Sequence, residues 1–79
     1  MIIKITNFII NEVIENTSSF QYFVDFDTIE RNFNIKVSTQ LQQQILDILS
    51  VRDEVADVEL TDESFDVVLY TSYCRETVD

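Results

Sequence analysis

The residues that could do chemistry are concentrated between positions 57 and 74, in the stretch DVELTDESFDVVLYTSYC. This stretch holds five carboxylates and no basic residue, and the carboxylates are Asp57, Glu59, Asp62, Glu63 and Asp66. Carboxylates in this density can serve acid–base catalysis, bind a hard metal ion, or attract a basic partner. The rest of the sequence discriminates among these three uses.

The chain lacks most of the residue types that enzymes use for catalysis. The sequence contains no histidine, so the usual general base and the commonest zinc ligand are both absent. Cys74 has no imidazole to activate it, and we expect it to pack near the end of a hairpin. Glycine is also absent, which removes the glycine-dependent phosphate-binding motifs. We therefore expect neither an enzyme nor a bound cofactor.

A calcium site of the EF-hand type can be tested directly against the run DVELTDESFDVV. With Asp57 as the first ligand, Glu59 and Thr61 fall at the third and fifth positions. However, Asp62 stands where the turn requires glycine, and Val68 stands where the motif places a bidentate glutamate. The spacing therefore does not predict a metal site.

Charge and length define the class of protein. The 79 residues carry a formal charge of −10, and residues 53–79 hold nine acids against Arg75 alone. Hydrophobic residues make up 46% of the chain, too many for a disordered acidic tail, so we expect one folded domain spanning residues 1–79. Such a charge repels phosphates, which argues against direct binding of nucleic acid or of an anionic membrane.

The chain has features of a cytoplasmic protein. A single cysteine excludes an internal disulfide and is compatible with a reducing compartment. The apolar start MIIKITNFII is short and has no small-residue cleavage signal after it, so it predicts neither a signal peptide nor a membrane span.

The acidic stretch itself predicts a β-hairpin, with strands at about 54–60 and 65–73 and a turn at 61–64. Because side chains alternate along a strand, one face should be buried and the other open. The buried set is expected to be Ala56, Val58, Leu60, Phe65, Val67, Leu69 and Tyr73. The open set is expected to be Val55, Asp57, Glu59, Asp66, Val68, Tyr70 and Ser72.

Helices and one further strand should complete the fold. The first segment predicts a brief strand followed by a helix from about Asn7, a loop at 16–19, and a strand in which Phe20, Tyr22 and Val24 alternate. Asp27 and Glu30 resemble a capping box at the start of a short helix, in which Asp27 can also pair with Arg31. Ile29 and Phe33 should share one side of that helix, which Asn32 or Asn34 can end in the left-handed conformation.

The strongest helical signal follows Ser38, a good N-cap residue. Leu41, Ile45, Ile48 and Leu49 follow at helical spacing and should be buried, whereas Gln40, Gln43, Gln44 and Asp47 should form a solvated face. The resulting fold class is α+β: a small antiparallel sheet with a C-terminal hairpin, and two to three short helices packed on one face.

The open face of the hairpin suggests binding of a basic surface. Acids two apart on a strand are separated by about 6.6 to 7 Å, close to the roughly 6 to 7 Å between phosphates along a nucleic-acid strand. A row of carboxylates can thus substitute for a row of phosphates. Two alternatives remain: the acids can be ordinary solvated positions that keep a sheet soluble, and the N-terminal segment can cover Val68 and Tyr70.

In length, acidity and lack of catalytic residues, the chain resembles the small phage-encoded inhibitors of host defence, anti-CRISPR proteins among them, with DVELTDESFD most similar to their acidic surfaces. Several of those proteins act as DNA mimics in the nucleic-acid channel of an effector complex. The resemblance implies an inhibitor in the host cell cytoplasm that binds a basic nucleic-acid-binding protein. From the residues of the hairpin itself, we expect the contacts to come from Asp57, Glu59, Asp62, Glu63, Asp66 and Tyr70.

The second hypothesis is a small structural or assembly protein that self-associates through Tyr70 and the hairpin edge. A monomer is expected for the inhibitor and a symmetric dimer for the assembly protein. We favour the monomer and the inhibitor.

Overall fold

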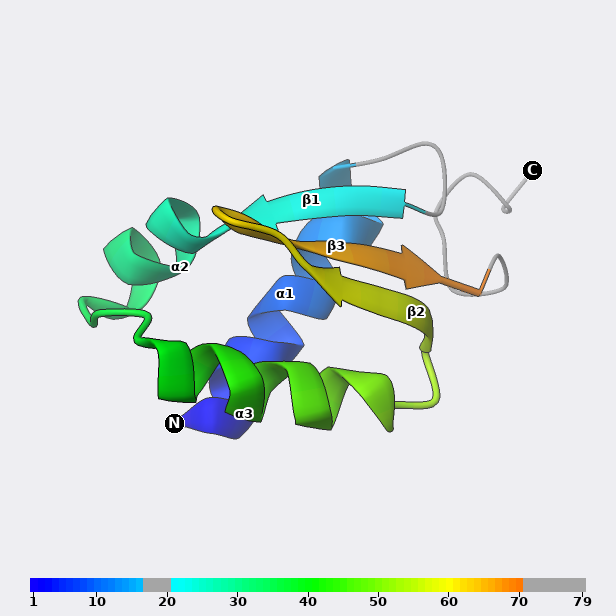
Figure 1. The fold of residues 1–79 in the computed structure, drawn as a ribbon. Coiled ribbons are helices and arrows are strands. Elements are labelled where there is room, and N and C mark those ends of the chain that lie inside the picture. Colours follow the sequence, from blue (N-terminus) through cyan, green and yellow to red (C-terminus); the bar gives the residue numbers. More distant parts are fainter. Residues whose placement is uncertain (17–20, 71–79) are drawn as a thin grey trace.

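A computed structural model describes residues 1–16 and 21–70 and shows a small α+β fold, as the sequence predicts. Its elements in chain order are α1 (Ile2–Asn16), β1 (Gln21–Asp25), α2 (Phe26–Phe33), α3 (Thr39–Ser50), β2 (Val55–Leu60) and β3 (Ser64–Leu69). The three strands form one antiparallel sheet in the order β1-β3-β2, so β3 is the central strand (Figure 1).

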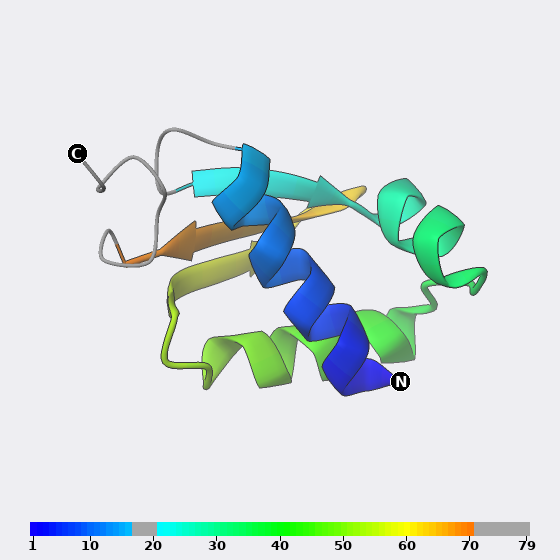
Figure 2. The same ribbon diagram turned by 180° about the vertical axis from the view of Figure 1, so that it is seen from behind.

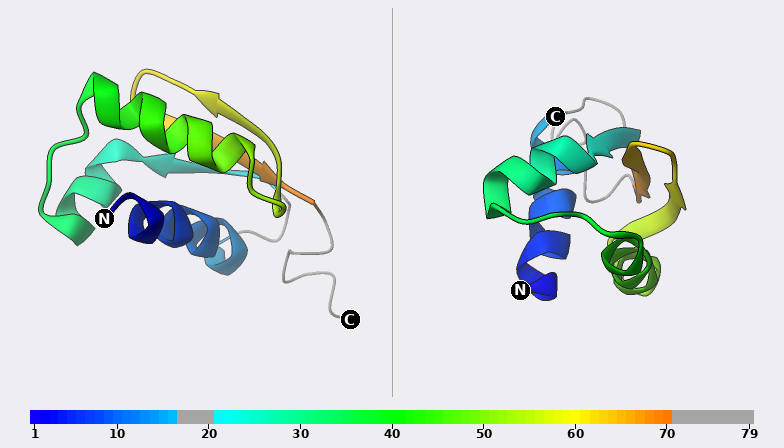
Figure 3. Two further views of the ribbon diagram at one scale, coloured as in Figure 1. Left: turned by 90° about the horizontal axis from the view of Figure 1, so that it is seen from below. Right: turned by 60° about the vertical axis from the view of Figure 1, so that its left-hand side comes forward.

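The helices cover one face of the sheet. Seen from behind, α1 crosses the sheet (Figure 2), and in the right-hand view of Figure 3 α1 and α3 both lie on the lower side of the strands. The short helix α2 lies at the end of the sheet where β1 stops, beside the turn that joins β2 to β3. In the part of the chain that the structure describes, no helix covers the other face of the sheet.

The core lies between α1, α3 and the covered face of the sheet. Each of these elements contributes aliphatic side chains that are almost fully buried, and the sheet adds Phe65, which has no exposed surface. The buried hydrophobic residues are Ile5, Ile9, Ile10, Val13, Val24, Ile29, Val37, Ile45, Leu49, Val55, Phe65, Val67 and Leu69. Two edge-to-face ring pairs, Phe26 with Phe65 and Phe8 with Phe33, attach α2 to this core.

The N-terminal prediction was wrong in one respect: no strand precedes α1. The helix begins at Ile2, and its buried side chains include Ile5, Ile9 and Val13, which keep helical spacing from the first turn. The β-branched run at the start favours a strand locally, but burial of one helical stripe against the sheet outweighs that preference. The buried hydroxyl of Thr6 donates to the carbonyl of Ile3 at 2.9 Å, which satisfies it within the helix.

The strand predicted near Tyr22 and Val24 is confirmed and is β1. The side chains of Tyr22 and Val24 both lie on the core side of the sheet. Phe20 and most of the loop predicted at 16–19 lie outside the described residues. Asn16, the first residue of that loop, is instead the last residue of α1.

The short helix α2 was predicted with the wrong cap. Asp25 occupies the N-cap position without a side-chain cap hydrogen bond, and Asp27 lies inside the first turn. Glu30 accepts a hydrogen bond from the backbone amide of Val37 at 2.9 Å, so it ties the following loop to the helix instead of closing a capping box. The predicted ion pair is present, with Arg31 Nε 3.3 Å from Asp27 Oδ2, and Asn34 ends the helix with φ of 55°.

The third helix matches its prediction closely at its start. Ser38 Oγ accepts from the amide of Leu41 at 3.2 Å, and α3 begins at the next residue, Thr39. Ile45 and Leu49 are fully buried, whereas Leu41 and Ile48 are only half-buried, contrary to expectation. These two lie towards the margin of the helix interface, where Ile48 borders a shallow hollow that it shares with Ile2, Gln44 and Asp47. The expected solvated face, Gln40, Gln43, Gln44 and Asp47, is exposed.

The predicted hairpin is present, but a β-bulge changes which residues face the core. The register shifts between Val55, which pairs with Leu69, and Asp57, which pairs with Val68. The extra residue, Ala56, is therefore exposed, and Val55 is buried, so both were assigned to the wrong face. Leu60, predicted to be buried, is 39% exposed at the end of β2. Ser72, Tyr73 and Cys74 lie outside the described residues.

Candidate functional site

The uncovered face of the sheet brings together side chains from all three strands. Its middle row consists of Phe23 on β1, Asp66 on β3 and Glu59 on β2, because Asp66 is the cross-strand partner of both other residues. The next row consists of Gln21, Val68 and Asp57 in the same strand order. We call these six residues the acidic sheet face.

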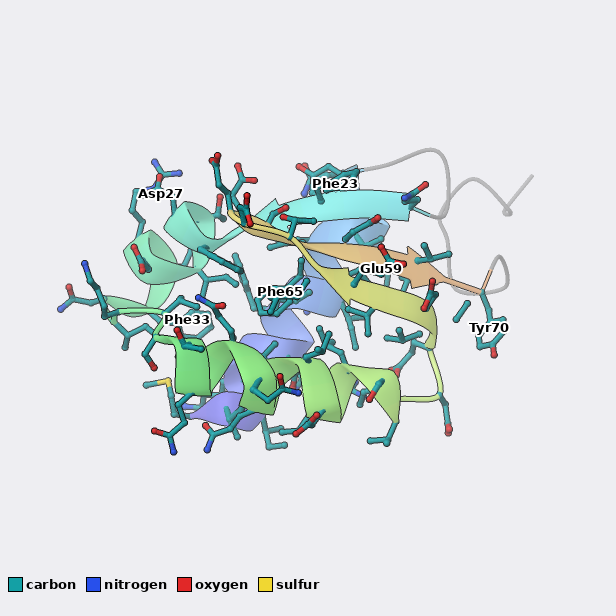
Figure 4. All side chains as sticks on the ribbon, viewed as in Figure 1. Phe23, Asp27, Phe33, Glu59, Phe65 and Tyr70 are labelled. Carbon is teal, nitrogen blue, oxygen red and sulfur yellow. The ribbon has the colours of Figure 1, made fainter. Side chains whose placement is uncertain are left out.

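Exposure of the acidic sheet face follows the alternation along each strand. Asp57 and Glu59 are exposed on the edge strand β2, and Asp66 is half-buried on the central strand. In Figure 4, Phe23 and Glu59 project from β1 and β2, while Phe65 lies between the sheet and α3. The prediction that Asp57, Glu59 and Asp66 share the open face is confirmed. The alternative that the N-terminal segment covers this face is wrong, because α1 packs on the opposite side.

A hydrogen bond across the sheet holds the central carboxylate in place. Gln21 Nε2 donates to Asp66 Oδ1 at 2.8 Å, and the two residues are 45 positions apart in the sequence. Asp66 stands directly opposite Glu59, and like charges at such positions repel. The amide donor of Gln21 partly offsets that repulsion and orients Asp66, leaving the Glu59 carboxylate exposed towards solvent.

Asp62 and Glu63 lie in the turn between β2 and β3, and both are exposed. The turn contains no glycine, and the hydroxyl of Thr61 organises it by accepting from the amides of Ser64 at 2.9 Å and Glu63 at 3.3 Å. The amide of Phe26 donates to the carbonyl of Glu63 at 2.8 Å, which joins the turn to the start of α2. These bonds hold the backbone that carries the two acids.

Tyr70 follows the last residue of β3 and is 54% exposed. Its backbone amide donates to the carbonyl of Glu54 at 3.1 Å, which continues the contact between the two strand ends. Figure 4 places the ring beyond the end of the sheet, so Tyr70 lies at one end of the acidic sheet face rather than within it. Of the six residues predicted to bind a partner, the five acids and Tyr70 are thus all accessible on the hairpin.

An ion pair fixes the connection from α3 to β2. The guanidinium of Arg52 donates to both carboxylate oxygens of Glu54, at 3.1 and 3.0 Å, and also to Asn7 Oδ1 on α1 at 2.8 Å. The hydrogen bonds from Arg52 lower the pKa of Glu54 below its ordinary value. Arg52 therefore joins α1 to the start of β2 and does not pair with the acids of the acidic sheet face.

The basic residues in the described part of the chain lie away from the acidic sheet face. Lys4 is on α1, Arg31 is paired with Asp27 on α2, Lys36 is in the loop before α3, and Arg52 is paired with Glu54. The six sheet-face and turn acids, Asp25, Asp57, Glu59, Asp62, Glu63 and Asp66, thus have no Lys or Arg partner among the ion pairs of residues 1–16 and 21–70. Within the described residues, no Lys or Arg side chain neutralises their negative charge.

Phe23 and Gln21 belong to this face, and Asp25 lies beside it at the end of β1, but none of the three was identified from the sequence. The signal was present in part, because Phe23 lies between Tyr22 and Val24, whose alternation was used to place the strand. What was missing was the pairing of β1 with β3, whose partner residues are 39 to 47 positions apart in the sequence. Without that pairing, the sequence does not show which side of β1 faces the core and which side lies beside the acids of β2 and β3.

Within the described residues, no group of three or more His, Cys, Asp or Glu side chains is arranged to hold a metal ion. In the same part of the chain, no helix is both long enough and apolar enough to cross a membrane. Comparison of the chain with protein-family models, with curated proteins and with solved structures finds no match in any of the three.

Proposed function

We propose that the acidic sheet face binds the basic nucleic-acid-binding site of another protein and occupies it in place of nucleic acid. The observation that carries this proposal is the gathering of Asp57, Glu59 and Asp66 on a sheet face that no helix covers. A surface with this sign of charge attracts a Lys- and Arg-rich site over long range and releases its counterions on contact.

The geometry of the strands supports mimicry of a phosphate row. Asp57 and Glu59 lie two residues apart on β2, a separation of about 6.6 to 7 Å, which is close to the roughly 6 to 7 Å between successive phosphates. Asp62 and Glu63 extend the acidic surface past the end of the strand. The sheet holds these side chains on paired backbone, so little ordering is needed when a partner binds.

In this function the protein is a non-catalytic inhibitor that uses no cofactor and acts as a monomer in the cytoplasm of the cell that contains its target. This is the mode of the small acidic phage-encoded inhibitors, anti-CRISPR proteins among them, that the sequence resembles. Its target is a basic nucleic-acid-binding protein or effector complex, and the nucleic acid itself is repelled.

The test begins with a pull-down from a host lysate, followed by mass spectrometry of the retained proteins. The identified partner is then titrated with the parent protein and with the triple variant Asp57→Asn, Glu59→Gln, Asp66→Asn at two ionic strengths, with nucleic acid as competitor. The parent should bind competitively with nucleic acid and more weakly at high salt. The triple variant should bind more weakly and with a smaller salt dependence.

A matched control separates the location of the charge from its amount. The variant Glu12→Gln, Asp27→Asn, Asp47→Asn removes three acids from α1, α2 and α3, so its net charge equals that of the triple variant. It should bind almost as tightly as the parent. Equal weakening by both variants, binding unaffected by salt, or simultaneous binding of nucleic acid would each contradict the proposal.

A further inference from the structure

Phe23 is an exposed aromatic residue in the middle of a strand. It is the third of the five residues of β1 and is 53% exposed, because its side chain lies on the acidic sheet face, away from the core. Its cross-strand partner is the carboxylate residue Asp66. An aromatic ring beside carboxylates on an uncovered sheet is the composition of a protein-binding anchor rather than of a solubilising surface.

A hollow adjoins this ring at the turn end of the sheet. It has a volume of about 440 Å³ and is lined by Phe23, Asp25, Thr61, Asp62, Glu63 and Ser64. One wall is the end of β1, and the other is the turn between β2 and β3. The hydrogen bond from the amide of Phe26 to the carbonyl of Glu63 joins these walls, so the hollow is defined by paired backbone.

The lining of the hollow fits a particular cation. It combines one aromatic ring with three carboxylates, from Asp25, Asp62 and Glu63. Within the described residues, these carboxylates are not arranged to hold a metal ion. A guanidinium is planar, stacks on an aromatic ring and donates hydrogen bonds to carboxylates along its edge, whereas the compact ammonium of lysine cannot stack on the ring.

We propose that this hollow receives an arginine side chain of the partner, which stacks on Phe23 and pairs with the carboxylates of Asp25, Asp62 or Glu63. The inference rests on the proposed function. If the acidic sheet face binds the basic site of a partner, the hollow is the place where an arginine of that site is preferred over a lysine. Long-range attraction brings the partner to the face, and the hollow then discriminates arginine from lysine at one point.

The test needs no identified partner. Isotope-labelled protein is titrated with tetra-arginine and tetra-lysine peptides of equal charge, and binding is followed by NMR shifts of the Phe23 ring and of the Asp62 and Glu63 amides. The arginine peptide should bind about two- to fivefold more tightly, as expected for an exposed cation–π contact, and should shift the Phe23 ring signals. Equal affinities, or shifts that leave Phe23 unaffected, would overturn the inference.

Two substitutions at Phe23 isolate the contribution of the ring. Phe23→Leu should abolish the preference for arginine while the lysine peptide binds as before, and Phe23→Tyr should retain the preference. Because the side chain is exposed, both variants should melt close to the parent, which checks that they remain folded. An arginine preference that persists in Phe23→Leu contradicts the inference.

The outcome is distinguishable from failure of the proposed function. If the triple variant loses affinity for the natural partner but Phe23→Leu binds both peptides like the parent, the acidic sheet face is a binding surface and the arginine site is wrong. If the peptides show the arginine preference but the triple variant binds the partner as tightly as the parent, the proposed function fails and the hollow remains an arginine site.

Discussion

Glu59 and Asp66 stand directly opposite each other on β2 and β3, so two carboxylates face one another across the hairpin on the uncovered side of the sheet. A pair of this kind opposes folding, because like charges at opposed positions repel. The hydrogen bond from Gln21 to Asp66 offsets the repulsion only in part. The hairpin thus carries a charge arrangement that is unfavourable for stability but suited to a basic partner.

Glu59→Gln should therefore stabilise the protein, by about 0.2 to 1 kcal/mol, because it removes the opposed charge and keeps the shape of the side chain. Added salt should raise the melting temperature of the parent more than that of the variant. Asp47→Asn on α3 is the control, since it removes the same charge and can still accept from Gln43. Equal stabilisation by both substitutions would indicate that total charge, not the cross-strand pair, is responsible.

Tyr70→Ala should speed dissociation from the identified partner by about tenfold or more and change association little, as expected for a desolvated aromatic anchor. Tyr70→Phe keeps the ring and should dissociate at nearly the parental rate. Surface plasmon resonance gives both rate constants. A change confined to the association rate would show that Tyr70 is not an anchor.

Ile45→Ala should destabilise the protein by about 2 to 5 kcal/mol, because Ile45 is fully buried between α3 and the sheet and its truncation leaves a cavity. Gln44→Ala, at the exposed neighbouring position, should change stability by less than about 0.5 kcal/mol. Urea unfolding followed by circular dichroism measures both. If Ile45→Ala melts within about a degree of the parent, Ile45 does not pack in the core between α3 and the sheet.

Asn34→Ala should cost about 1 kcal/mol, because residue 34 has φ of 55° and alanine lacks the short polar side chain that lets asparagine tolerate this left-handed conformation. Asn34→Gly should be at least as stable as the parent. Asn11→Ala, at an exposed position inside α1, serves as the comparison and should be neutral or slightly stabilising. Thermal unfolding of the three variants tests this, and equal loss in Asn34→Ala and Asn34→Gly would contradict it.

The Arg52–Glu54 ion pair should make stability depend on pH in a defined direction. Because the pKa of Glu54 is lower in the folded protein than its ordinary value of 4.5, its stabilising contribution is complete above that ordinary value and is lost as the pH falls through the lowered pKa. The parent should thus be more stable than Glu54→Gln at pH 7, and the difference should shrink below about pH 4. Urea unfolding of both proteins across this pH range measures the difference in their free energies of unfolding. A difference that does not change with pH would exclude the Arg52–Glu54 ion pair as its source.

Local patterns in the sequence determined several elements. Ser38 and the apolar spacing of Ile45 and Leu49 define α3, and the alternation from Glu59 to Asp66 defines the hairpin and places its acids on one face. The pair Asp27–Arg31 and the helix end at Asn34 are also local. These features depend on residues within about one turn or one hairpin of each other, so helical and strand periodicity is sufficient to predict them.

Tertiary packing decided the rest. The bulge at Ala56, the helical first turn of α1 and the pairing of β1 with β3 each depend on how separate elements fill one core, and no short window of sequence contains that information. The same pairing brings Phe23 beside Asp66 and Gln21 into hydrogen-bonding contact with it. The sequence alone therefore determined that the hairpin carries an exposed row of acids, whereas the long-range contacts of β1 decided that an aromatic ring and a hollow lie beside them.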